Sequence, residues 1–241
     1  MKVGAYSIES AAAFEMHLLR HVLLPYLMSL VWVVELLMQL VTADLPCNRS
    51  QIEERLKKAD IIPQFFDRAP KHVLEIEYND KVAVEFGNIL DSSKVKRMPV
   101  LMRWPSNFTT FYTLIMTDLD SDVSRRPSKY NEWQHWVVGN IPGHFHQMGE
   151  TLTPYMGAMA PHWLEFKKGH HRFVFSVYKQ KNGKIYFTAP RLPAMFDARR
   201  TNFSTRLFSE EYELGQPVAI NYFLVQPREP TARPRRWKQQ L

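Results

Sequence analysis

The sequence predicts a mainly β fold in which one sheet packs against another. Segments with strand-like patterns of apolar residues recur between residues 74 and 225. Several of these segments are apolar on both faces, which suits inner strands that are covered on each side. The 241 residues are 45% hydrophobic and 23% charged, and this composition can build a globular core.

The first 43 residues are expected to be a targeting segment outside this fold. An apolar stretch runs from Val22 to Val41, and small residues end it at Ala43, in the order of a signal-peptidase site. We therefore predict a signal peptide over residues 1–43 and a secreted, extracellular mature protein. The alternative is a membrane anchor through residues 22–41. Glu35 argues against the anchor, because a carboxylate near the middle of a spanning helix costs about 2.5 to 3.5 kcal/mol.

Three Asn-x-Ser/Thr sequons agree with a secretory route. Asn48, Asn107 and Asn202 are the candidate glycosylation sites. The single cysteine, Cys47, excludes an internal disulfide framework and any zinc or iron–sulfur site that needs several cysteines. We interpret Cys47 as an unpaired thiol without a catalytic role.

Residues 44–226 are expected to form one β-rich domain, because no internal repeat and no glycine-rich linker divides them. A short helix opens the domain. Ser50 and Glu53 have the spacing of a capping box, the helix extends to about Ala59, and Pro63 stops it.

A hairpin is the next expected element. Leu74, Ile76 and Tyr78 alternate on one face of a strand, Asn79-Asp80 forms the turn, and a return strand runs from Val82 to Phe86. Further strands are expected over residues 111–117, 135–141, 171–180, 184–187 and 218–225, with a tight connection at Lys181-Asn182-Gly183 and a second helix within residues 201–212.

The positive charge of the chain is concentrated at its C-terminal end. The formal net charge is +7, which is compatible with anionic partners. Residues 227–241 supply +4 of it, from five basic residues against one acid, and contain three prolines. We interpret this basic segment as a solvated tail. With no nucleic-acid motif present, we expect no nucleic-acid partner.

Polar residues with binding chemistry lie at the ends of the expected strands. Asp118 and Asp120 follow one apolar strand, His135 opens a second, and His171 begins a third. Two imidazoles beside carboxylates could form a small anion pocket, in which histidine N–H groups donate to phosphate oxygens and the aspartates hold the rings or bind an amine. Each residue alone has a structural explanation, as a turn former or as a satisfied histidine.

Four segments together carry a resemblance to a known family. They are FYTLIMTDLDSD, KYNEWQHWVVGNIPG, PYMGAMAP and GHHRFVFSVYKQ, in this order. They resemble the Asp-Pro-Asp-x-Pro signature with its preceding strand, the Glu-Trp and histidine stretch, the Tyr-x-Gly-x-x-x-Pro loop and the His-Arg-aromatic strand of the phosphatidylethanolamine-binding proteins. The resemblance covers the chain from about Ile52 to Val225.

The resemblance implies two packed antiparallel sheets with a few short peripheral helices, and a small surface pocket. Asp118, Asp120, His135 and His171 match the family's two aspartates and two histidines. The implied ligand is a phospholipid head group or a small phosphorylated molecule, bound without a metal or another cofactor. The family also implies a protease or a signalling protein as a partner, and a membrane surface is a further candidate.

The departures from the family pattern point to a more apolar pocket. Leu119 and Asp122 stand where the signature loop has prolines, so the loop loses two fixed φ angles and gains a carboxylate. Phe173 and Phe223 stand where the family has tyrosines, although Tyr222 is adjacent. We therefore expect Phe173 and Phe223 to contribute apolar surface to the ligand site.

Three functions remain open at this point. The first is non-enzymatic binding of a phospholipid head group or another small anion in the pocket. The second is a protease inhibitor or signalling regulator that acts through a surface loop containing Trp163–Lys168. The third is a carrier of small apolar ligands, suggested by the two phenylalanines.

The sequence gives no support for catalysis. His144, His146 and His162 could ligate zinc, but a turn sequence precedes the first two and HExxH is absent. The motifs GxSxG and GxxxxGK[ST] are also absent. We expect no catalytic residue and no metal site.

Overall fold

The computed structural model describes residues 48–121, 132–158, 170–195 and 197–226. Several predictions fall outside these residues: the leader, Cys47, Asp122, the Trp163–Lys168 loop and the basic tail. The predicted extents of the leader, domain and tail therefore stay predictions. Among the described residues, no helix is long and apolar enough to cross a membrane.

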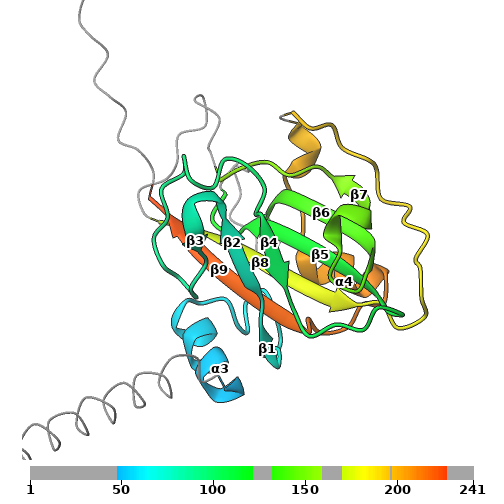
Figure 1. Cartoon of the computed structure of the whole chain (residues 1–241), viewed down its shortest axis with the longest axis horizontal. Coiled ribbons are helices and arrows are strands. Elements are labelled where there is room, and N and C mark those ends of the chain that lie inside the picture. Colours follow the sequence, from blue (N-terminus) through cyan, green and yellow to red (C-terminus); the bar gives the residue numbers. More distant parts are fainter. Residues whose placement is uncertain (1–47, 122–131, 159–169, 196, 227–241) are drawn as a thin grey trace, which may run out of the picture. The chain divides into compact units, whose positions relative to one another are not determined.

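Two sheets make up the described domain, as the sequence predicted (Figure 1). The large sheet has the order β1-β9-β8-β5-β6-β7, and the small sheet has the order β3-β2-β4. The large sheet contains β1 (His72–Val73), β5 (Phe111–Asp118), β6 (Trp133–Pro142), β7 (Glu150–Thr153), β8 (His171–Lys179) and β9 (Ala219–Val225). The small sheet contains β2 (Glu75–Tyr78), β3 (Val82–Ala83) and β4 (Leu101–Arg103). All strand pairs are antiparallel except β1 with β9, which is parallel and corrects the all-antiparallel expectation.

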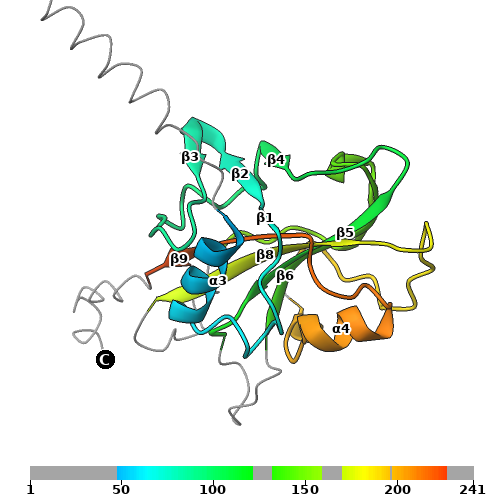
Figure 2. The ribbon, with the colours of Figure 1, turned by 90° about the horizontal axis from the view of Figure 1, so that it is seen from below.

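The helices lie on the other side of the large sheet from the small sheet (Figure 2). They are α3 (Arg49–Lys58) and α4 (Thr205–Glu211), and short 3-10 turns occur at η2 (Asn79–Lys81), η3 (His146–Met148) and η4 (Ala198–Arg200). We call the side covered by α3 and α4 the helix face of the large sheet, and the other side its inner face. The predicted second helix is α4, with Ser204 as its N-cap.

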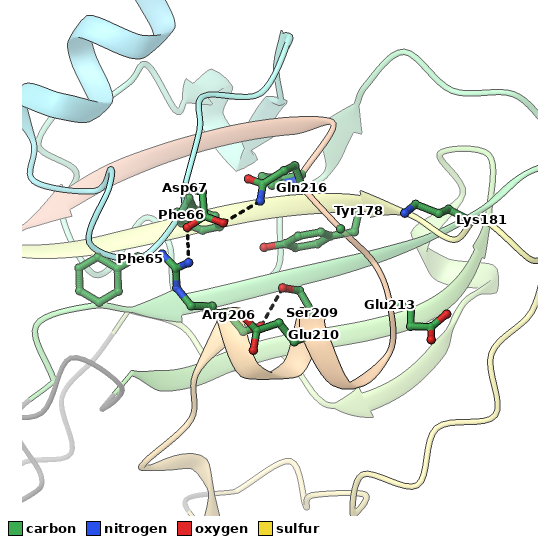
Figure 3. Close-up of a pocket in the computed structure, with 12 residues that line it drawn as sticks. Phe65, Phe66, Asp67, Tyr178, Lys181, Arg206, Ser209, Glu210, Glu213 and Gln216 are labelled. Atoms are coloured by element: carbon green, nitrogen blue, oxygen red, sulfur yellow. Dashed lines mark hydrogen bonds and ion pairs between the residues drawn. The ribbon is translucent and has the colours of Figure 1, made fainter.

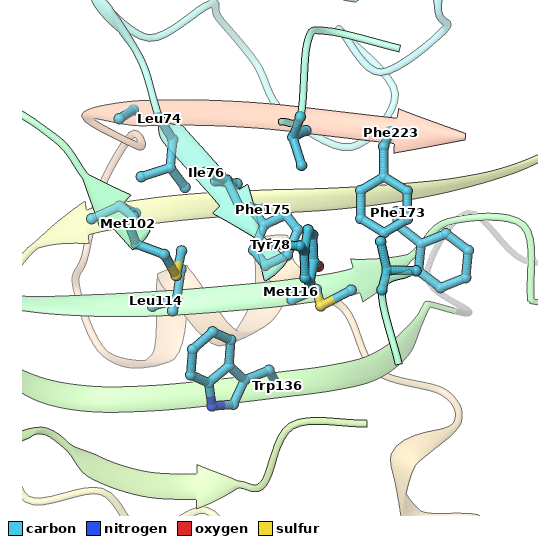
Figure 4. Close-up of a cluster of buried hydrophobic side chains, with 14 of the residues drawn as sticks. Leu74, Ile76, Tyr78, Met102, Leu114, Met116, Trp136, Phe173, Phe175 and Phe223 are labelled. Carbon is cyan, nitrogen blue, oxygen red and sulfur yellow. The ribbon is translucent and has the colours of Figure 1, made fainter. Parts of the chain in front are cut away.

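Each face of the large sheet packs against its own hydrophobic core. On the inner face, Leu114, Phe175 and Phe223 contact the small sheet's Ile76 and Tyr78 (Figure 4). On the helix face, the buried residues include Ile52 and Leu56 of α3, Ile115, Phe208 and Tyr222. Every residue of β5 from Tyr112 to Asp118 is buried. This double coverage explains why the strand reads as a continuous apolar run.

The cap of α3 lies two residues earlier than predicted. Asn48 Oδ1 accepts a hydrogen bond from the Gln51 amide at 3.0 Å, and Gln51 Oε1 accepts one from the Asn48 amide at 3.0 Å. The chain thus contains two overlapping matches to the capping-box pattern, and the structure uses Asn48 with Gln51. Glu53 instead pairs with Lys57 at 2.6 Å, one turn further along the helix.

The strand predicted over residues 184–187 is not formed. The Ile185 amide donates to Asn140 Oδ1 at 2.8 Å, and Asn140 Nδ2 donates to the Ile185 carbonyl at 2.9 Å. A side-chain amide therefore satisfies both backbone groups of Ile185, in place of a neighbouring strand. Gln180 holds Asn140 in place, since its Nε2 donates to Asn140 Oδ1 at 2.9 Å.

Candidate functional site

The antiparallel pairing brings the predicted polar residues to one end of the large sheet. β5 ends at Asp118, and its neighbours β6 and β8 both begin there. Asp118 is opposite Phe173 of β8 on one side and Trp133 of β6 on the other. His171 and His135 therefore lie next to the end of β5, as the strand-end argument required.

Asp118 and His171 form a buried pair. His171 Nδ1 lies 2.8 Å from Asp118 Oδ2, and both side chains are only 5% exposed. The second oxygen, Asp118 Oδ1, accepts a hydrogen bond from the Asp120 amide at 2.9 Å. Asp118 thus fixes the orientation of the His171 ring and the path of the chain after β5, with both of its oxygens engaged.

His135 is held as a neutral imidazole. Its Nδ1 lies 2.8 Å from the Met156 carbonyl oxygen, which can only accept, so Nδ1 carries the proton and Nε2 is an acceptor. Burial lowers the pKa of His135 to about 4, despite the opposing charge of Asp118. The prediction that both imidazoles donate N–H groups to an anion is therefore corrected for His135, which accepts at neutral pH.

Both carboxylate oxygens of Asp120 bind Arg172. They accept hydrogen bonds from Arg172 Nη2 at 2.7 Å, Nε at 2.9 Å and the backbone amide at 2.8 Å. Arg172 Nη1 also donates to the carbonyls of Ala59, at 2.6 Å, and Asp60, at 3.2 Å, just after α3. Burial opposes the charge on Arg172, but the hydrogen bonds and charge of Asp120 outweigh it and raise the Arg172 pKa. Asp120 thus ties the segment after β5 to α3.

Phe173 and Phe223 lie in the core of the inner face. Their exposed fractions are 1% and 0%, and their rings stack with centroids 5.2 Å apart (Figure 4). Phe173 also packs its ring 4.9 Å from the His135 ring. The two phenylalanines therefore support the site from beneath rather than lining an open surface, which corrects the expectation. Tyr222 packs in the helix-face core, so its hydroxyl does not replace the missing donors.

A buried arginine that the sequence did not single out braces the strand that carries His135. Arg200 has an exposed fraction of 0%. Its guanidinium donates to the carbonyl oxygens of Gln134 at 3.2 Å, His135 at 3.3 Å, Pro154 at 3.1 Å and Pro193 at 2.8 Å. Only backbone atoms receive these bonds, so no residue pattern could have revealed the contact.

His144 and His146, two histidines of the zinc alternative, have local partners. His144 Nδ1 lies 3.2 Å from Ser106 Oγ, and the buried His146 packs edge-on against Trp136. No group of three His, Cys, Asp or Glu side chains within the described ranges could hold a metal ion. His162, the third member of the zinc alternative, lies outside those ranges.

The three sequon asparagines are exposed in the folded domain. Asn48 caps α3, and Asn107 Oδ1 accepts hydrogen bonds from Thr109 N at 3.0 Å and Thr109 Oγ1 at 2.9 Å. Asn202 has a left-handed backbone with φ of 55°. Glycosylation at these positions stays a prediction.

A separate pocket of about 390 Å³ lies on the helix face (Figure 3). Arg206 of α4 forms an ion pair with Asp67, and Gln216 Nε2 donates to the other Asp67 oxygen at 3.1 Å. The other charged residues that line the pocket include Lys181, Glu210 and Glu213, so the lining contains both positive and negative side chains. We interpret the Asp67 bonds as a structural junction of three chain segments.

Comparison with known proteins identifies relatives along most of the described domain. The sequence profile of the family described as phosphatidylethanolamine-binding protein matches residues 76–223. A protein named putative odorant-binding protein A5, from Drosophila melanogaster, is 29% identical over 73% of this chain and 80% of its own length.

Two solved structures share the fold. The solution structure of CG7054 is 32% identical, with a TM-score of 0.54, over 70% of this chain and 92% of its own. A carboxypeptidase Y inhibitor, solved in complex with its cognate proteinase, is 23% identical, with a TM-score of 0.56, over 78% of this chain and 98% of its own. All six residues predicted for the ligand site fall within the matched profile.

Proposed function

Because the chain belongs to the phosphatidylethanolamine-binding protein family, we propose that it is a non-enzymatic binding protein for a phospholipid head group or another small phosphorylated ligand. His135 and His171 contact the ligand. Asp118 and Asp120 are positioning residues, since their oxygens already hold His171, the chain after β5, and Arg172.

The observation that carries the proposal is the pairing of two different imidazoles at one strand end. His135 is neutral and offers an acceptor at Nε2. His171 is backed by the Asp118 carboxylate, which balances the charge whenever the ring is protonated and donates to an anion. A ligand with an anionic oxygen and a nearby hydrogen-bond donor matches both rings. Phosphoethanolamine, with its phosphate and ammonium groups, has this chemistry.

Asparagine substitutions give a sharp test of the two rings. An asparagine amide can replace the donating Nδ1–H of histidine but has nothing at the position of Nε2. His135→Asn and His171→Asn therefore keep the bonds to Met156 and Asp118 while removing the ring nitrogens assigned to the ligand. His144→Asn is the matched control, because His144 lies outside the site.

Isothermal titration calorimetry with O-phosphoethanolamine measures the outcome. We expect each site variant to weaken binding by about tenfold or more, the loss of a hydrogen bond to a charged group, and His144→Asn to bind like the wild type. Thermal unfolding of each variant shows that the fold is intact. Wild-type affinity in both site variants would refute the site assignment.

A second candidate function is the carriage of small apolar ligands. The relative named as an odorant-binding protein favours it. It predicts that neutral aliphatic alcohols displace an apolar fluorescent probe and that His171→Asn leaves this displacement unchanged. O-phosphoethanolamine binding that depends on the histidines, without probe displacement, would exclude the carrier.

We further propose that the protein is secreted through its leader and glycosylated at one or more of Asn48, Asn107 and Asn202. Mass spectrometry of protein from the culture medium of expressing cells tests this, because it gives the mature N-terminus and any glycan masses. A protein retained in the cells that carries the intact leader and no glycan would refute it.

A further inference from the structure

A second cavity lies on the helix face, away from the inner-face residues that support the histidine site. Its volume is about 520 Å³, within the usual range of small-molecule sites of roughly 300 to 1,000 Å³. α3 contributes Arg55 and Lys58 to its lining, and Arg172, Tyr222 and Leu224 come from β8 and β9. Ala59, Phe86, Gly87 and His170 complete the lining.

The rim of this cavity carries uncompensated positive charge. Arg55 and Lys58 are exposed, and neither forms an ion pair with a described residue. Arg172 is the one lining cation with a described carboxylate partner, Asp120. No aspartate or glutamate lines the cavity within the described ranges. The pocket in Figure 3 differs, because acids and bases face each other there.

The floor of the cavity is aromatic and carries a tyrosine hydroxyl. Phe86 and Tyr222 are 8% and 6% exposed, and their rings meet edge to face with centroids 5.8 Å apart. No described residue forms a hydrogen bond with Tyr222 Oη. Burial raises the pKa of Tyr222, against the charges of Arg55 and Arg172, so the hydroxyl stays a donor at neutral pH.

Gly87 shows where this hydroxyl lies. A Cβ atom on Gly87 would be 2.7 Å from Tyr222 Oη, and the residue has φ of 98°. Gly87 and Tyr222 both line the cavity, so the hydroxyl ends at its wall beside the glycine. A tyrosine hydroxyl at a cavity wall can donate a hydrogen bond to water or to a ligand.

We propose that this cavity is a second binding site, specific for an anionic amphiphile. Arg55 and Lys58 hold a phosphate, sulfate or carboxylate head, and Phe86 and Tyr222 pack against an aromatic or acyl body. Tyr222 Oη donates to an oxygen of the head. The ligand is either a free metabolite of this chemistry or an anionic lipid at a membrane surface, and the two sources share the same contacts.

Nuclear magnetic resonance titration of the full chain with phenyl phosphate at low ionic strength tests the site. We expect saturable shifts of the Gly87 and Leu224 amides. Arg55→Gln with Lys58→Gln should weaken this binding about tenfold or more, and Tyr222→Phe, which removes only the hydroxyl, about fivefold. The control is Arg49→Gln with Lys57→Gln, which removes the same charges from α3 outside the cavity.

The outcomes separate this site from the histidine site. His135→Asn should leave the titration at Gly87 unchanged, so either site can fail alone. Absence of shifts at Gly87 and Leu224, or equal weakening by the two double variants, would overturn the proposal.

Vesicles identify the source of the ligand. Cosedimentation with phosphatidylcholine vesicles containing phosphatidic acid should fall in the Arg55→Gln, Lys58→Gln variant but not in its control if the ligand is a membrane lipid. If the two double variants cosediment equally, and only Arg55→Gln with Lys58→Gln weakens phenyl phosphate binding, the ligand is a free metabolite.

Discussion

Removal of the Asp120 carboxylate should destabilise the domain through Arg172. Asp120→Ala deletes the acceptor of three hydrogen bonds, two of them from the guanidinium. The Asp120 and Arg172 side chains are 29% and 19% exposed, so the stranded charge is only partly solvated.

The expected cost lies between the values for surface and buried ion pairs. Truncating one partner of a buried pair costs about 3 to 5 kcal/mol, whereas exposed pairs contribute about 0 to 1 kcal/mol. Solvent reaches nearly a third of Asp120, and the Ala59 and Asp60 carbonyls still accept from Arg172 Nη1. We therefore expect a loss of about 2 kcal/mol in the free energy of unfolding.

Urea denaturation measures this loss, as a lower midpoint with an unchanged slope. Glu53→Ala is the matched control, because Glu53 also pairs with a cation, Lys57, but that pair is local and its side chains are 42% and 61% exposed. The control should change the midpoint little. A midpoint for Asp120→Ala that equals the control's would refute the account of Asp120 as the residue that ties the segment after β5 to Arg172.

Three further predictions concern stability. The pKa of His135 is lowered from 6.5 to about 4, so the unfolded chain binds more protons between these values. The contribution of neutral His135 to the free energy of unfolding is therefore fully present above pH 6.5 and falls by about 2 to 3 kcal/mol as the pH drops towards 4. Urea titrations of His135→Asn should lack this dependence on pH. Asn140→Ala should cost about 2 to 4 kcal/mol and speed hydrogen exchange at the Ile185 amide, since it removes both bonds to that residue; slow exchange there would contradict the bridging role. Asn48→Ala should lower the free energy of unfolding by about 1 kcal/mol, and Ser50→Ala by clearly less, because Asn48 is the N-cap of α3. A larger loss in Ser50→Ala, measured by thermal unfolding, would make Ser50 the N-cap instead.

The strands were predictable because the spacing of apolar residues along each segment indicates which of its faces are buried. Leu74, Ile76 and Tyr78 alternate on a one-sided strand, and β5 reads as apolar throughout because both of its faces are covered. Residues 184–187 have the same local pattern but no strand beside them. A distant side chain, Asn140, takes their backbone bonds, and local sequence does not contain that contact.

The candidate site was predictable as a set of residues but not as a set of roles. Antiparallel pairing brings Asp118, His135 and His171 to one end of the sheet, as strand-end positions suggested. The chemistry of each depends on a partner that the sequence does not show. The Met156 carbonyl makes His135 an acceptor, and Arg172 engages Asp120.

Adjacent residues on β9 show how one position changes a role. Phe223 and Tyr222 face opposite sides of the large sheet, because side chains alternate along a strand. The tyrosine hydroxyl next to the expected position therefore belongs to the helix face, at the second cavity. The alternation of side chains along β9 therefore decides which of the two residues supports the histidine site and which lines the second cavity.

The most direct test of the histidine site is nitrogen-15 nuclear magnetic resonance of the two imidazole rings during titration with O-phosphoethanolamine. Before ligand is added, His135 should show a protonated Nδ1 and an unprotonated Nε2 at neutral pH. On saturation, the Nε2 resonances of His135 and His171 should shift while the Nδ1 resonance of His135, bonded to Met156, stays in place. Saturable binding that leaves both Nε2 resonances unchanged would contradict the proposed site.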